Sequence, residues 1–479
     1  MNALIALLAL LVQSGAVHAP APTARPNFVV ILGEGHGWSS TSVDMDGADP
    51  RDAQPAGLTP QLERLAADGM RFSAFYASCP RCTPSRASFL TGISPAKLHM
   101  TYVNEGGSNK RNKRGAESAD DETPRASTKV VPPHPDSELP AGAKTTGDAL
   151  RELGYATAHF GKWHVGRADP TRHGFDVADG ANTNQGPERG VNPNPKQATV
   201  ISERAIEFMR DAVKAGKPFF VQIDHYGAGS EDEVTPESLA ETKALLPKAK
   251  AKQLATAAGV RDMDKAIGGV LAAINEMGLA GNTFVVFSTD HGTPGGGGKS
   301  GGVNAPLAGG KGSVREGGVR VPFIVRGPGI ERGAVSGVRA SGMDLLPTLR
   351  DLAGHPLPRP ERPDDTFVVE GGSLAGVLLH GGVGGVDRPR EEFVIHYPHE
   401  DLDNGGPASA IYLGEFKLIR NYETGKVSLF DIAKDRGESN DLAASMPEKA
   451  KDLETRLDAY LKAVNAQMPT PAPAPETSR

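Results

Sequence analysis

Cysteine is scarce in this chain: its 479 residues include only two, Cys79 and Cys82. A C-x-x-C pair can be a redox disulfide or one half of a zinc site. No second pair completes a zinc site, and no thioredoxin-like context surrounds this one. A redox pair stays an alternative, and a disulfide between the two cysteines would leave Cys82 unavailable for other chemistry.

Excess positive charge and long apolar runs are also missing. The net charge is −6, which gives no basic surface for a nucleic-acid partner. The apolar run at residues 3–12 is too short to span a bilayer, so no membrane span is expected. Small residues follow it as far as Ala19, and this pattern predicts a signal peptide over residues 1–19. We therefore expect a secreted or periplasmic protein.

Short apolar segments alternate with amphipathic ones along most of the chain. This alternation predicts an α/β fold with a mainly parallel sheet sandwiched by helices. The predicted strands are residues 28–32, 155–160, 219–223 and 283–288, and the predicted helices are residues 60–68, 147–153, 200–214 and 262–277. Residues 105–140 are polar and proline-rich, which indicates an irregular segment.

The pattern changes after about residue 358. Short strands with glycine-containing turns are predicted at 393–397, 410–412, 416–420 and 427–430, followed by an amphipathic helix at 448–464. The length of the chain favours one large domain and a smaller one. We therefore predict an α/β domain at 20–360, a smaller antiparallel sheet plus helix at 361–466, and a disordered tail at 467–479.

The most specific motif is C-T-P-S-R, which begins at Cys82 and continues to L-T-G at residues 90–92. Thr83 is suited to cap a helix and Pro84 to occupy its first turn. This predicts that Cys82 lies just before a helix N-terminus, where free N–H groups and the macrodipole favour an anion. Arg86 follows one turn later and is expected to point to the same place. A buried free cysteine at an ordinary helix start is the alternative.

Acidic residues follow two of the predicted strands. Glu34 and His36 come after the strand at 28–32, and Asp290 and His291 come after the strand at 283–288. The carboxyl ends of parallel strands are where α/β sheets place their ligands. Oxygen ligands suit hard divalent cations such as Ca²⁺. The alternatives are a turn capped by Asp290 and a packed, non-ligating His36.

Basic residues occur in two glycine-bounded segments. In G-K-W-H-V-G, Lys162 and His164 are two residues apart, so an extended backbone would point both side chains the same way. Lys311 lies in G-G-K-G, where small residues let the backbone approach a ligand closely. A strand with a polar outer face and a flexible loop are the plainer interpretations.

In this order, these motifs resemble those of the formylglycine-dependent (type I) sulfatases of the alkaline-phosphatase-like superfamily. The resemblance extends from Arg25 to about Leu461, and includes E-G-G-x-R-V-P at residues 316–322. It implies hydrolysis of a sulfate ester, on a carbohydrate or another small molecule. It also implies that a formylglycine-generating enzyme oxidises Cys82 to an aldehyde whose hydrate attacks sulfur, with a divalent metal, Ca²⁺ in most of the family, at the site.

The resemblance implies a role for each matching residue. The metal ligands would be Glu34, residue 82, Asp290 and His291, and the positive charges facing the sulfate would be Arg86, Lys162 and Lys311. His164 would hold the formylglycine hydroxyl.

Two positions depart from the family pattern. Gly35 stands where a second aspartate is common, so His36 or water would complete the metal site. Gly229 stands where a histidine is common. His225 lies nearby and would either protonate the leaving oxygen or be purely structural. If it is structural, Lys311 must supply that proton.

Two other functions remain open. A phosphonate or phosphate diester hydrolase of the same superfamily would use a similar nucleophile and metal, because a fold alone does not fix a reaction. A non-catalytic anion- or glycan-binding relative is the other possibility, and the departures at Gly35 and Gly229 are its support. The residues do not identify the alcohol half of the substrate.

Overall fold

The structure is a computed structural model that describes residues 25–47, 54–103, 129–184, 196–295, 302–401 and 406–472. The predicted signal peptide, residues 105–128 of the predicted irregular segment and residues 473–479 of the predicted tail lie outside these residues. No helix in the described ranges has the length and apolar content that a membrane crossing requires.

Eight strands form the main sheet, in the order β10-β2-β9-β8-β1-β7-β5-β6. Their bounds are Asn27–Gly33 (β1), Met70–Phe72 (β2), Ala156–Gly161 (β5), Val177–Ala178 (β6), Phe219–Asp224 (β7), Thr283–Thr289 (β8), Phe323–Arg326 (β9) and Ala334–Ser336 (β10). Only β9 runs against its neighbours, β2 and β8, and every other pair is parallel. The expected mainly parallel sheet is therefore confirmed, and the four predicted strands are β1, β5, β7 and β8.

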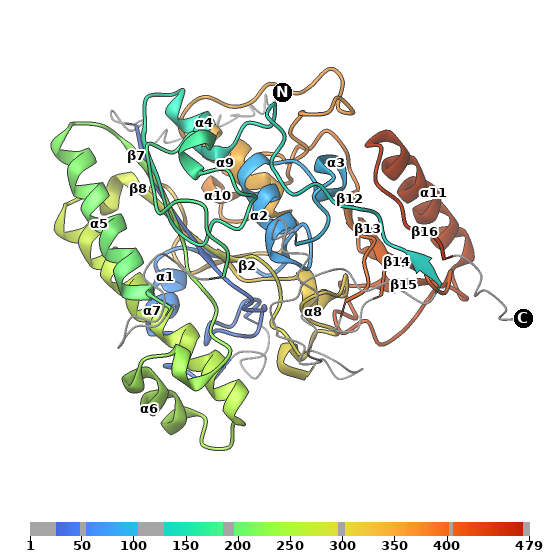
Figure 1. The fold of residues 1–479 in the computed structure, drawn as a ribbon, viewed down its shortest axis with the longest axis horizontal. Coiled ribbons are helices and arrows are strands. Elements are labelled where there is room, and N and C mark those ends of the chain that lie inside the picture. The colour runs from blue at the N-terminus through green and yellow to red at the C-terminus, as the bar shows by residue number, and fades with distance from the viewer. Residues whose placement is uncertain are drawn as a thin grey trace, which may run out of the picture.

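Helices cover both faces of this sheet, because successive side chains of β1 enter two different cores. Phe28, Val30 and Leu32 pack with one set of helices, whereas Val29 and Ile31 pack with another. The first set is α2 (Cys82–Thr91), α4 (Thr146–Arg151), α9 (Leu345–Leu352) and α10 (Ala375–Leu379). The second set is α1 (Pro60–Ala67), α5 (Ala198–Lys214) and α7 (Ala251–Glu276), and Figure 1 shows α5 beside α7. A strand buried on both faces is typical of such sheets.

A second sheet lies toward the C-terminus. Its strands are β12 (Phe393–Tyr397), β13 (Ala408–Leu413), β14 (Phe416–Asn421) and β15 (Val427–Asp431), all antiparallel, and α11 (Pro447–Ala463) packs on it. The sheet and helix lie together at one end of the molecule in Figure 1. The predicted smaller antiparallel sheet with a helix is confirmed, while the boundary at residue 360 stays a prediction.

The smaller elements complete the described chain: β3 (Phe75–Tyr76), β4 (Val130–Val131), β11 (Ala340–Ser341), β16 (Thr470–Pro471), α3 (Pro95–Leu98), α6 (Pro236–Leu245) and α8 (Glu316–Val319), with single 3₁₀ turns between them. β16 pairs with β4 and lies inside residues 467–479, the predicted disordered tail, whose extent stays a prediction. That pairing joins positions far apart in the sequence, which composition cannot reveal.

The long helix α7 begins eleven residues before the predicted start at residue 262. Its first turns bury mainly alanines, such as Ala255 and Ala258, and pack on α6, whose cap is Thr235. Alanine is a strong helix former but contributes little apolar contrast, so the periodic signal is weak there.

Candidate active site

The candidate site lies where the carboxyl ends of several parallel strands meet the N-terminus of α2. Glu34 follows β1, Lys162 follows β5, Asp224 ends β7 and Asp290 follows β8. These strands are adjacent in the sheet, so their ends lie side by side. Parallel sheets place ligands at this edge because every strand there ends in a loop or a helix start.

Cys82 is the first residue of α2 rather than the residue before it. Arg81 is the N-cap, with extended φ −134° and ψ 153°, so the expected Thr83 cap is wrong. The expected end of the helix is confirmed, because Gly92 is its C-cap with a left-handed φ of 69°. Asp401, from the C-terminal part, contacts this N-cap residue: it accepts hydrogen bonds from Nε and Nη2 of Arg81 and from the Tyr397 hydroxyl.

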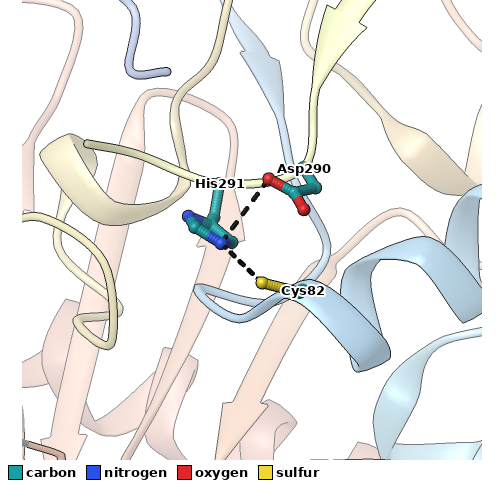
Figure 2. A group of neighbouring side chains, drawn as sticks. All are labelled: Cys82, Asp290 and His291. Carbon is teal, nitrogen blue, oxygen red and sulfur yellow. Dashed lines mark hydrogen bonds and ion pairs between the residues drawn. The ribbon is translucent and has the colours of Figure 1, made fainter. Parts of the chain in front are cut away.

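The Cys82 thiol faces His291, and its Sγ lies 3.1 Å from Nε2 of that ring (Figure 2). The other ring nitrogen, Nδ1, is 2.9 Å from the Gly292 carbonyl, which accepts its hydrogen bond and leaves Nε2 with a lone pair in the neutral ring. Burial would raise the pKa of Cys82, but Lys162, Lys311 and His291 together bring it well below its ordinary value. Residue 82 therefore sits where negative charge is stabilised.

Arg86 is buried and links two carboxylates. Its Nε donates to Asp290 Oδ2 at 3.0 Å, while Nη1 donates to Asp224 Oδ2 at 2.9 Å and to the Lys162 carbonyl at 2.8 Å. Burial alone would lower the pKa of Arg86, but Asp290 and Asp224 raise it above its ordinary value. The guanidinium thus points to the expected region, although its charge is shared by two acids.

Glu34 and Lys162 form an ion pair beside Cys82. Lys162 is fully buried and donates to Glu34 Oε1 and to Asn184 Oδ1, the latter at 2.7 Å. Glu34 Oε2 accepts from the Gly227 amide at 2.8 Å, and Oε1 is 4.0 Å from Cys82 Sγ. Burial would raise the pKa of Glu34, yet the cations around it, Lys162 first, hold the value at about 2. The acid is therefore ionised across the neutral range.

The segment carrying Lys162 and His164 is not extended as predicted. Gly161 has φ 90° and His164 has φ 52°, both left-handed, so the chain turns twice there. A side chain at residue 161 would collide with the Asp224 carbonyl, 2.0 Å from an added Cβ, which explains the glycine. His164 is buried, and its amide donates to the Asn182 carbonyl at 2.9 Å. Lys311 is half-buried, and its charge lowers the pKa values of Cys82 and Glu34.

The two glycines that depart from the family pattern, Gly35 and Gly229, both donate backbone hydrogen bonds to acidic side chains, and a buried histidine lies close to each of them in the sequence. The Gly35 amide donates to Asp290 Oδ1 at 2.9 Å, and the Gly229 amide donates to Glu233. The ring of His36 lies close to Gly33, with Cδ2 3.2 Å from an added Cβ there. Burial lowers the pKa values of His36 and His225 to about 4, and neither nitrogen of the His225 ring has a hydrogen-bond partner within the described ranges.

One group in the described residues offers a set of metal ligands: Cys82, Asp290 and His291, with donor atoms within 4.8 Å of one another. His36 is not part of this group, and Glu34 adjoins it through the 4.0 Å approach to Cys82. A carboxylate, a neutral imidazole and an anion at residue 82 fit a divalent cation. The imidazole nitrogen is a softer donor than the oxygens that Ca²⁺ prefers.

The sequence interpretation missed three residues of this site. Asp224 and Asn184 bind Arg86 and Lys162, and Asp401 binds Arg81. Asp224 directly follows a predicted strand, so the strand-end argument that selected Asp290 would also have selected it. Asn184 and Asp401 carried no signal, because each reaches the site from a loop whose position depends on the tertiary fold.

Comparison with known proteins agrees with this geometry. A family model described as Sulfatase matches residues 26–355. The rat N-acetylgalactosamine-6-sulfatase (Rattus norvegicus) is 30% identical over 86% of this chain and 74% of its own length. Human arylsulfatase A (Homo sapiens) is 29% identical over 80% of this chain and 74% of its own length. The crystal structure of Ps i-CgsB in complex with k-i-k-neocarrahexaose has a TM-score of 0.70 at 22% identity and covers 92% of this chain and 93% of its own, which shows the shared fold.

The chain therefore belongs to the sulfatase family, which makes it a sulfuric ester hydrolase with an α/β fold. The predicted family resemblance is confirmed. The roles of the individual site residues stay proposals.

Proposed function

We propose that this sulfatase hydrolyses a sulfate ester on a carbohydrate, with a formylglycine made from Cys82 as its nucleophile. The observation that carries the proposal is the position of Cys82, in the first turn of α2 and 3.1 Å from His291, where cations lower its pKa. An attacking oxygen and an incoming sulfate both carry negative charge. A preorganised positive site removes their repulsion without reorganising during the reaction.

The chain's own residues divide this work. Lys162 and Lys311 contact the sulfate oxygens, His164 orients the hydroxyl at residue 82, and Arg86 holds Asp290 in place. Once formed, formylglycine supplies a hydrated aldehyde, one hydroxyl of which attacks sulfur while the other allows sulfate to leave. The helix N-terminus adds a favourable field for the charge that develops at residue 82.

A divalent metal would be held by residue 82, Asp290 and His291, with Glu34 adjoining. When bound, it polarises a sulfate oxygen and offsets charge during attack. The resemblance predicts Ca²⁺. The imidazole nitrogen of His291 is also a suitable ligand for a softer divalent ion.

The leaving oxygen needs a proton. Lys311 is half-buried and positively charged beside residue 82, so we assign that proton to Lys311. His225 stays the alternative, although its fully buried ring, with a pKa near 4, is neutral at pH 7.

A sulfated carbohydrate as substrate is supported by the relatives. One relative is named N-acetylgalactosamine-6-sulfatase, and Ps i-CgsB was crystallised in complex with k-i-k-neocarrahexaose. A formylglycine-generating enzyme is the partner that the proposal requires. The predicted signal peptide would direct the protein to the periplasm or out of the cell.

The test begins with a mass spectrum of the peptide that spans Cys82, from protein made with and without the converting enzyme. We expect formylglycine in the first sample, with turnover of an aryl sulfate far exceeding that of the matched aryl phosphate diester. Greater turnover of the phosphate would favour the diester hydrolase. Absence of both modification and turnover would favour the binding protein, and a Cys79–Cys82 disulfide would favour the redox pair, although both thiols are free in the structure.

The variant Cys82→Ser provides a sharper control. The serine hydroxyl is able to attack sulfur, but the side chain lacks the second hydroxyl that releases sulfate. We expect a sulfate adduct on this peptide and no sustained turnover. Undiminished steady turnover would refute the mechanism.

A further inference from the structure

Asp224 is a buried acid that no motif of the sequence singles out, and three donors converge on its Oδ2 atom. Arg86 Nη1 lies at 2.9 Å, Gln222 Nε2 at 3.2 Å and His159 Nε2 at 3.3 Å. All four side chains are at most 2% exposed. A carboxylate so far from water is stable only because it is paired and hydrogen-bonded. Its surroundings are therefore built around the negative charge.

The backbone of Asp224 also belongs to the site. Its carbonyl accepts the hydrogen bond of the Lys162 amide at 2.8 Å, and Arg86 donates to the carbonyl of that same lysine. Arg86 therefore binds the ends of β7, β5 and β8 at once, through Asp224, Lys162 and Asp290. With five N–H donors in one plane, an arginine is suited to such a bridge, whereas a lysine is not.

The contact between Arg86 and Asp290 determines which carboxylate oxygen of Asp290 faces His291. Arg86 binds Oδ2, while Oδ1 accepts from the Gly35 amide and lies 3.5 Å from His291 Nε2. If Arg86 turned away from Asp290, that carboxylate could rotate and lose its alignment with His291 and residue 82. The second acid, Asp224, prevents this because it fixes the far end of the guanidinium.

We propose that Asp224 is a positioning residue of this sulfatase, which acts through Arg86 to hold Asp290 in register with His291 and residue 82. The proposal rests on the proposed function of residue 82 as the nucleophile. Asp224 and Asp290 are the two carboxylates that pair with the buried Arg86 guanidinium, each at 2.9 Å. Partners in this outer layer of a site commonly change its activity or metal affinity about 10- to 100-fold when they are replaced.

The test compares Asp224→Asn with Asp344→Asn. Asp344 is an equally buried acid whose two oxygens accept from Arg388 at 2.8 and 2.6 Å, and it binds none of the residues of the site. Both variants break a buried arginine–carboxylate pair, so both should melt at lower temperature. For Asp224→Asn we expect kcat on an aryl sulfate to fall about 10- to 100-fold with KM nearly unchanged. For Asp344→Asn, kcat below its melting temperature should stay near that of the parent.

A double-variant cycle then distinguishes positioning from general damage. Arg86→Lys removes the fork through which Asp224 acts, so adding Asp224→Asn to it should lower kcat no further. Adding Asp344→Asn to Arg86→Lys should likewise leave kcat unchanged but lower the melting temperature. Independent losses of kcat from Arg86→Lys and Asp224→Asn, or an unchanged kcat in Asp224→Asn, would overturn the proposal.

Formylglycine content is measured by mass spectrometry in every sample, and kcat is calculated per converted chain. If the parent protein itself shows neither formylglycine nor turnover, the proposed function has failed. If the parent is active and the cycle gives independent losses, the inference about Asp224 alone has failed.

Discussion

The Sγ atom of Cys82 lies 3.1 Å from Nε2 of His291, although 209 positions separate the two residues in the chain. The Gly292 carbonyl fixes the ring by accepting from its Nδ1. A thiol and an imidazole at this distance share a proton, and nearby lysines favour the form in which sulfur is ionised. The environment of residue 82 therefore stabilises an anion even before any modification.

This relationship predicts the titration of the unmodified protein. In protein made without the converting enzyme and stripped of metal by a chelator, thiolate absorbance should appear at a lower pH than for an ordinary cysteine, because the pKa of Cys82 is lowered. The signal should vanish in Cys82→Ser and persist in Cys79→Ser, since burial raises the pKa of Cys79. A midpoint at or above the ordinary cysteine value of about 8.5 would contradict this.

Two glycines with the same backbone conformation form a matched pair for mutation. Gly312 has φ 80° and Gly354 has φ 81°, so alanine costs both sites about 1–2 kcal/mol of left-handed strain. Only at Gly312 would the added Cβ meet a neighbour, Asp401 Cγ at 2.4 Å. Because Asp401 holds Arg81, the N-cap before Cys82, we expect Gly312→Ala to lower kcat and Gly354→Ala to lower only the melting temperature. Equal kcat values would show that the Arg81–Asp401 pair does not influence the site.

The buried His225 predicts acid sensitivity. Burial lowers its folded-state pKa to about 4 from the unfolded value near 6.5. The unfolded chain therefore binds the extra proton between these values, and stability is lost as the pH falls from 6.5 to 4, with no further loss below. At 1.4 kcal/mol per pKa unit this is roughly 3 kcal/mol.

His225→Leu should remove that part of the loss, measured as the difference in unfolding free energy between pH 7 and pH 4 in urea. The surface variant His380→Leu should show the same loss as the parent. We also expect kcat of His225→Leu to stay within a few-fold of the parent at pH 7. A large drop that grows with the basicity of the leaving alcohol would instead assign the leaving-group proton to His225.

A buried charge network joins the C-terminal sheet to α8 and β3. Lys417 on β14 is fully buried and pairs with Glu316 at 3.0 Å and Glu438 at 2.8 Å, and the hydroxyls of Tyr76 and Tyr412 donate to Glu316. Lys417→Met would leave buried Glu438 without its cation and Glu316 with Arg320 alone, so we expect a loss of about 3–5 kcal/mol of stability. The exposed pair Lys451–Glu454 is the control, and Lys451→Met should change stability by less than about 1 kcal/mol. Chemical denaturation measures both, and similar values would contradict the prediction.

The sequence predicted the fold well where burial leaves a strong local signal. β1 and β8 contain uninterrupted apolar runs and β7 is apolar up to Gln222, and Asp290 was selected because acids at the ends of such strands converge. The same sequence predicted an extended backbone around Lys162, which is wrong because Gly161 and His164 both turn left-handed. A glycine allows such a turn but does not require it, and the requirement comes from the Asp224 carbonyl, 2.0 Å from where a side chain would begin.

The partners of the site residues were the least predictable part. Arg86 was expected to neutralise sulfate, yet two buried acids share its charge. Neither pairing has a local signature, because each joins segments more than a hundred positions apart. Motifs therefore identified which residues matter, and tertiary contacts determined what each of them touches.

The pair between Arg81 and Asp401 has a consequence for biosynthesis. Its two halves are 320 positions apart, so the residue that precedes Cys82 has no anchor until most of the chain has been made. At about 5–20 residues per second, a ribosome needs roughly 15–60 s to cover that distance. The side chain of Cys82 is 1% exposed once folding is complete. Until that pairing forms, the proposed converting enzyme would meet Cys82 in an unfolded segment, so slower translation would lengthen the time available for the proposed oxidation.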